Sequence, residues 1–86
     1  MITGKTSSGF AFSVEEHVLD SMELLDAIVE ADENPAALSK VVKLILPKDQ
    51  QQALYNHLRT KKGNVPIMAV AQEVAEIFSY TPEGKN

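Results

Sequence analysis

The chain contains no cysteine among its 86 residues, and it has no long apolar run. The missing thiols exclude disulfide bridges, thiolate zinc sites and cysteine nucleophiles. No segment approaches the ~20 consecutive apolar residues that cross a bilayer, and no apolar signal core follows Met1–Lys5. We therefore expect a soluble, unexported protein of the cytoplasm that has no membrane partner.

Basic side chains are also few. Eight Lys and Arg residues stand against twelve Asp and Glu residues, which gives a net charge of -4 and a pI near 5.0. Nucleic-acid binding takes most of its affinity from cationic contacts to phosphates, so this balance disfavours a nucleic-acid partner. The length and the 44% hydrophobic content suit one small packed domain and leave no room for a two-domain enzyme.

The N-terminal part of the chain has the pattern of a β-hairpin. Large apolar and small residues alternate over Gly9–Val14, which places Phe10 and Phe12 on one face of a strand. The short polar residues of Thr6–Gly9 favour a turn ahead of that strand. We predict a hairpin over residues 2–14.

A helix is predicted to follow at once, over about 14–31. Ser13 and Glu16 have the spacing of a capping box, in which each side chain satisfies a free backbone N–H of the first turn. The expected inward stripe consists of large apolar residues at spacings of three and four, widened on one side: Val18, Met22, Leu25 and Val29, with Leu24 and Ile28.

Three more amphipathic helices are predicted, over about 35–46, 48–62 and 66–79. Asn34 and Pro35 suit the start of the first, Gly63 suits the end of the second, and Pro66 suits the start of the third. The connectors are short, so the helices should pack as a compact antiparallel bundle.

The expected fold is therefore mainly α, a compact bundle of about four short helices preceded by an N-terminal β-hairpin. It occupies a single domain over residues 1–80, and the polar residues 81–86 are expected to form a flexible C-terminal tail.

Two chemical alternatives stay open. Asp20-Ser21-Met22 resembles the modified segment of acyl carrier proteins, although the predicted helix places Ser21 in its interior. The cluster of Arg59, Lys61 and Lys62 permits a small helical regulator that binds DNA. His17 and Asp20 share a helical face, but such pairs are common on solvated surfaces, and we predict no metal and no cofactor.

The order of several features resembles that of tail assembly chaperones from long-tailed bacteriophages or prophages of Gram-positive bacteria. The matching segments run along nearly the whole chain: Ser8–Val14, Leu19–Leu25, Asn34–Leu38, Val41–Leu46, Lys48–Leu58, Gly63–Pro66 and Glu83–Asn86. The chain departs from the family pattern at Pro47-Lys48, where Gly-Glu is expected.

This resemblance implies a non-enzymatic protein that binds the tape measure protein, keeps its long hydrophobic helices soluble and helps to bring tail tube subunits to it. Helix-in-groove packing would serve such a role, and the groove should appear as an exposed apolar patch. The residues predicted to contact the partner are Phe10, Phe12, Tyr55 and Phe78.

Overall fold

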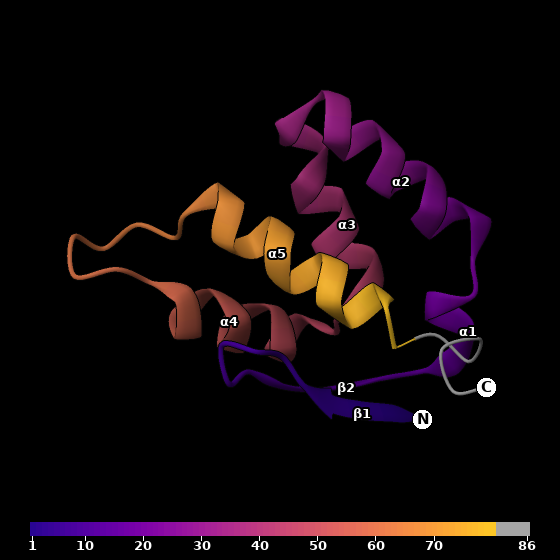
Figure 1. Ribbon diagram of the computed structural model, residues 1–86, viewed down its shortest axis with the longest axis horizontal. Coiled ribbons are helices and arrows are strands. Elements are labelled where there is room, and N and C mark those ends of the chain that lie inside the picture. Colours follow the sequence, from indigo (N-terminus) through magenta and orange to yellow (C-terminus); the bar gives the residue numbers. More distant parts are fainter. Residues whose placement is uncertain (81–86) are drawn as a thin grey trace.

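A computed structural model describes residues 1–80 and is mainly helical, with an antiparallel hairpin at its N-terminus (Figure 1). The predicted fold class is confirmed. The predicted tail, residues 81–86, lies outside the described residues. The elements in chain order are β1 (Ile2–Lys5), β2 (Ala11–Val14), α1 (Glu16–Leu19), α2 (Met22–Glu33), the 3-10 turn η1 (Pro35–Ala37), α3 (Leu38–Ile45), α4 (Lys48–Leu58) and α5 (Ile67–Phe78).

The hairpin has the predicted face. Ile2 pairs with Val14 and Gly4 with Phe12, and the apolar side chains of these pairs turn toward the helices. Phe12 meets the ring of Tyr80 edge-on, with 5.0 Å between the ring centroids. A Cβ at Gly4 would stand 2.7 Å from that tyrosine ring, so only glycine allows this close approach.

The predicted capping box at the first helix does not form. The Gln50 side-chain amide, from α4, binds both backbone groups of Ser13: the Ser13 N–H donates to Oε1 (3.0 Å), and Nε2 donates to the Ser13 carbonyl (2.8 Å). This long-range contact keeps Ser13 in the extended conformation of β2. Glu15 therefore takes the N-cap position of α1, and Glu16 is its first helical residue.

The predicted helix over 14–31 is also interrupted, so the prediction of one continuous helix is wrong. The backbone leaves the helical region at Asp20 (φ -103°, ψ 65°) and Ser21 (φ -142°, ψ 129°). Asp and Ser side chains compete with helical backbone bonding, which makes them suitable at such a break. The interruption lets Leu19 enter the core while α2 turns to pack on α3.

The inward face of α2 differs from the predicted one. Leu24 and Ala27 are 1% and 2% exposed, whereas Met22 and Val29 are 66% and 57% exposed. Helix α3 packs against this side, where Ala27 lets the two helix backbones approach closely. The predicted stripe is therefore right for Leu24 and Ile28, which lie in or against the core, and wrong for Met22, Leu25 and Val29, which face outward.

The remaining helices follow the predicted order with different ends. Asn34 Oδ1 accepts from the Ala36 N–H (3.2 Å), as expected of an N-cap residue. The predicted helix over 48–62 ends at Leu58, because Thr60 begins a tight turn that closes with the Gly63 N–H donating to its carbonyl (3.0 Å). Gly63 adopts a positive φ of 95° in that turn.

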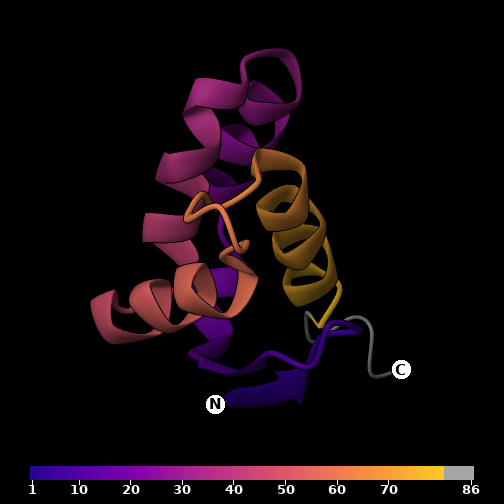
Figure 2. The same cartoon turned by 90° about the vertical axis from the view of Figure 1, so that its left-hand side faces the viewer.

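The core lies where the hairpin and the helices meet. Helix α3 contacts both α2 and α5, and Figures 1 and 2 show the hairpin below α4. The core consists of fully or nearly buried apolar side chains from the hairpin, the five α-helices and the residue that follows α3: Ile2, Phe10, Phe12, Val14, Leu19, Leu24, Ala27, Val41, Val42, Ile45, Leu46, Leu54, Val70, Val74 and Ile77.

Candidate partner-binding surface

An apolar groove opens on the surface between α3, α4 and α5. Leu38 and Val42 form its α3 wall, and Tyr55 lines it from α4. Ile67 and Val70, from the first turn of α5, line the opposite side. The groove has a volume of about 390 Å³, and η1 closes one end of it. Apolar surface of this kind gains free energy when a partner removes it from water, at about 25 cal/mol per Å².

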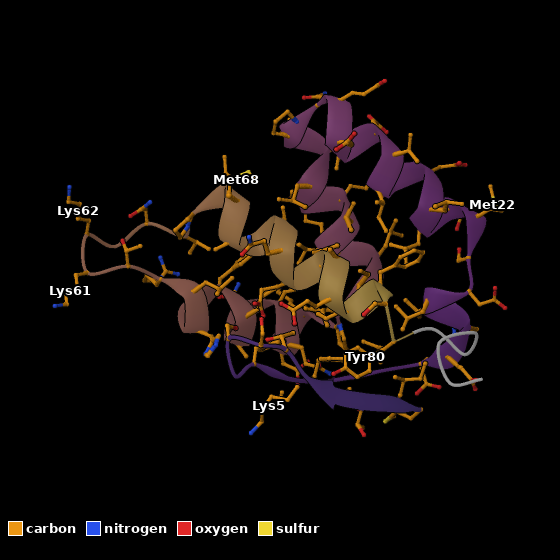
Figure 3. All side chains as sticks on the ribbon, viewed as in Figure 1. Lys5, Met22, Lys61, Lys62, Met68 and Tyr80 are labelled. Atoms are coloured by element: carbon orange, nitrogen blue, oxygen red, sulfur yellow. The ribbon has the colours of Figure 1, made fainter. Side chains whose placement is uncertain are left out.

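The edge of the groove carries an exposed large side chain. Ile67 is 60% exposed, although its spacing of three from the buried Val70 continues the apolar stripe of α5. The next residue, Met68, is 72% exposed and points away from the fold (Figure 3). Two adjacent residues of a helix are about 100° apart around its axis, so both cannot occupy the centre of one inward face. The adjacency of Ile67 and Met68 directly after Pro66 therefore indicates, from the sequence alone, that at least one of these two apolar side chains is exposed.

The four residues predicted to contact a partner fall into two groups. Phe10 and Phe12 are 5% and 3% exposed and belong to the core, which corrects their assignment to a contact surface. Tyr55 is half-buried and lines the groove. Phe78 is half-buried against the core and lies at the far end of α5 from Ile67. Tyr55 alone among the four joins the groove.

A polar cluster attaches the hairpin turn to α5. The Thr6 hydroxyl donates to Glu73 Oε1 (2.7 Å), and Glu73 is 3% exposed. Ser7 donates to Glu76 twice, from its hydroxyl to Oε2 (2.7 Å) and from its backbone N–H to Oε1 (2.8 Å). These contacts join residues 67 and 69 positions apart in the chain, so no local pattern announces them.

The same turn reaches α4 through a serine and a histidine. Ser8 Oγ lies 3.1 Å from His57 Nε2, and the same nitrogen is 3.1 Å from the Ser8 carbonyl oxygen. The Phe10 ring packs beside the imidazole with a centroid separation of 5.8 Å. A serine beside a histidine resembles an activated nucleophile, but such a base needs a third group to orient it. The nearby carboxylates of Glu73 and Glu76 are bonded to Thr6 and Ser7 instead.

The Ser7–Glu76 contact predicts an acid-sensitive contribution to stability. The Ser7 hydroxyl first, and its backbone N–H second, hold the pKa of Glu76 below its ordinary value of 4.5. A carboxyl with a lowered pKa in the fold stabilises it fully above 4.5 and loses that contribution as the pH falls below 4.5. We expect Glu76→Gln to lose less stability than the wild type across this range in urea unfolding. Ser7→Ala should show an intermediate slope, and a wild-type slope in Glu76→Gln would contradict the assignment.

The residues of the chemical alternatives are spread over the molecule. Ser21 lies at the N-cap of α2, not inside a helix as predicted, and its modification stays a prediction. Arg59 donates to the Gly63 carbonyl (2.8 Å), while Lys61 and Lys62 lie at the tip of the α4–α5 connection, far from Met22 (Figure 3). DNA binding there stays a prediction as well.

Residues 1–80 contain neither a metal-binding cluster nor a membrane-spanning helix. Within this range no three His, Asp or Glu side chains come together as a set that could hold a metal ion. No helix in the described part of the chain combines the length and the apolar character needed to cross a membrane. Compared with known proteins, the chain matches no family model, no curated protein and no solved structure.

Proposed function

We propose that this protein is a non-enzymatic phage tail assembly chaperone of the bacterial cytoplasm, which binds an apolar helical segment of the tape measure protein and helps to recruit tail tube subunits. The observation that carries the proposal is the apolar groove between α3, α4 and α5, with Ile67 exposed at its edge. The resemblance of the chain to that family supplies the identity of the partner.

The groove has the properties that a helix-binding site needs. An amphipathic helix presents apolar side chains at spacings of three and four, and a groove between helices accepts them as a row. Leu38, Val42 and Val70 provide apolar walls, and Tyr55 adds an aromatic ring. Aromatic residues are enriched among those that dominate binding energy. A partner that must be kept soluble would bury its own apolar face here.

The test is co-expression with a tape measure protein whose gene lies near the gene of this chain. We expect the chaperone to co-purify with it and to raise its soluble amount. Ile67→Gln should weaken binding by about tenfold, because burial of a large aliphatic side chain contributes about 1.5 kcal/mol or more. Glutamine is a good helix former, so α5 should persist.

Met68→Gln is the matched control, since Met68 is adjacent to Ile67 and similarly exposed to solvent but does not line the groove. It should bind as the wild type does. If the tape measure protein stays insoluble with the wild-type chain, the proposed function is wrong. If Ile67→Gln and Met68→Gln bind equally well, the groove is not the site.

A further inference from the structure

The outward face of α2 carries a second exposed apolar surface, the α2 stripe, which consists of Met22, Leu25 and Val29. These side chains are 66%, 39% and 57% exposed, and their spacings of three and four place them along one line of the helix. Figure 3 shows Met22 pointing away from the fold. Isolated apolar residues on a surface are ordinary, but a row of three along one helix marks a contact site.

The α2 stripe is separate from the groove. Helix α2 packs on α3 through its opposite side, where Leu24 and Ala27 are buried. The groove is lined by residues of η1, α3, α4 and α5 and by the connection ahead of α5, and no residue of α2 lines it. A partner on the stripe would therefore leave the groove open.

Carboxylates flank the stripe on both sides. With 100° of rotation per residue, Asp26 and Glu33 lie along one edge of the stripe and Asp32 along the other. Glu23 and Glu30 follow beyond the first edge, and all five residues are exposed. The stripe is thus an apolar row with negatively charged side chains on both sides.

The segment that carries these carboxylates contains no cationic residue of its own, and the next ones along the chain are Lys40 and Lys43 of α3. The segment from residue 6 to residue 39 contains eight of the twelve Asp and Glu residues of the chain and none of its eight Lys and Arg residues. A surface that is both apolar and strongly acidic has a definite complement. It is a helix with its own apolar row and with lysine or arginine on either side of that row.

We infer that the α2 stripe is a docking surface for a basic amphipathic helix of a partner protein. The 12 residues of α2 extend about 18 Å, enough to meet three turns of such a helix. Anionic lipid surfaces and nucleic acids would be repelled by the carboxylates. A symmetric contact with a second copy would bring two acidic faces together, which is unfavourable for the same reason. The inference holds whether or not the groove takes a tape measure helix.

The probe is a fluorescent lysine–leucine peptide whose leucines recur at spacings of three and four. A glutamate–leucine peptide with the same leucine positions is its charge-reversed counterpart. Binding to the intact protein is measured by fluorescence anisotropy at low and at high ionic strength. We expect the lysine–leucine peptide to bind at least about tenfold more tightly than the other, with affinity that falls as salt screens the carboxylates.

The double variant Met22→Gln/Val29→Gln tests the apolar row. It should weaken binding of the lysine–leucine peptide by about tenfold, whereas Met68→Gln, an equally exposed methionine of α5, should bind it as the wild type does. Asp26→Asn/Glu30→Gln should weaken binding at low ionic strength and flatten its salt dependence. Circular dichroism and thermal unfolding confirm that each variant is folded, which high exposure of all these positions favours.

Three results would overturn the inference. One is equal binding of both peptides to the wild type. Another is unchanged binding by Met22→Gln/Val29→Gln, which would reduce the interaction to general charge attraction. The third is self-association of the wild type in sedimentation that this double variant abolishes, because the stripe would then be covered by a second copy. Ile67→Gln is the comparison variant for the groove: a larger loss of peptide binding in Ile67→Gln than in Met22→Gln/Val29→Gln would place the peptide in the groove, so a failure of the stripe is distinguishable from a failure of the groove.

Discussion

Replacement of Leu54 by alanine is expected to destabilise the fold by about 2–5 kcal/mol, the range for deleting most of a buried leucine side chain. Leu54 is 0% exposed and joins α4 to the central core. A domain of this size has a total stability of only about 4–13 kcal/mol at the usual contribution per residue. The variant should therefore lose a large share of its stability, and its urea midpoint should fall accordingly.

Two controls separate the loss of packing from other effects of changing α4. Leu54→Met keeps nearly the same volume and should cost less than about 1.5 kcal/mol. Gln52→Ala, at an exposed position of the same helix, should change stability by no more than about 0.5 kcal/mol. Equal unfolding midpoints for Leu54→Ala and Gln52→Ala would show that α4 does not pack on the core as described.

The parts of the fold that the sequence predicted correctly depend on contacts between near neighbours. The hairpin follows from the alternation over Gly9–Val14 and from a turn of small polar residues, both visible within one short window. The start of the segment behind Asn34 follows in the same way, because the cap bond reaches only two residues along the chain. Short-range geometry of this kind is encoded locally.

The parts that were predicted incorrectly depend on partners distant in sequence. Ser13 would cap a helix if its backbone groups were free, but Gln50, 37 residues away, holds them in a strand. The inward side of α2 is decided by how closely α3 approaches Ala27, which no pattern of large side chains in α2 alone contains. Tertiary contacts override local preference at both places.

The predictions for the candidate site were also partly correct, and the errors again concern residues whose burial depends on distant parts of the chain. Tyr55 was predicted as an apolar helix residue left exposed for contact, and it lines the groove. Phe10 and Phe12 were predicted as contact residues because they are the aromatic residues of the strand, yet large aromatic residues on the inner face of a hairpin are the ones that a small core needs most. Ile67 continues the apolar stripe of α5 beyond the point where other elements cover the helix, so periodicity alone does not reveal its exposure.

Thr6→Val is expected to produce the second large effect, a loss of more than about 2 kcal/mol, since a buried polar group left unpaired costs about 1–3 kcal/mol and a charged one more. The Thr6 hydroxyl, 4% exposed, donates to Glu73 (2.7 Å) and accepts from the Phe10 N–H (3.2 Å). Valine has nearly the same shape but can do neither. Thr6→Ser keeps both bonds and gives up one methyl group, so it should cost only about 1 kcal/mol.

The cause of the Thr6→Val effect is identified by removing the other partner too. When both members of a buried polar pair become apolar, the desolvation penalty disappears, so Thr6→Val/Glu73→Met should recover much of the loss. The double-mutant cycle in urea unfolding should give a coupling energy of about 0.5–3 kcal/mol between the two positions. If Thr6→Val were no more harmful than Thr6→Ser, the hydroxyl would not be what attaches the hairpin turn to α5. The hairpin turn would then be attached to α5 through the surface contact between Ser7 and Glu76. The contribution of that contact to stability decreases as the pH falls below 4.5.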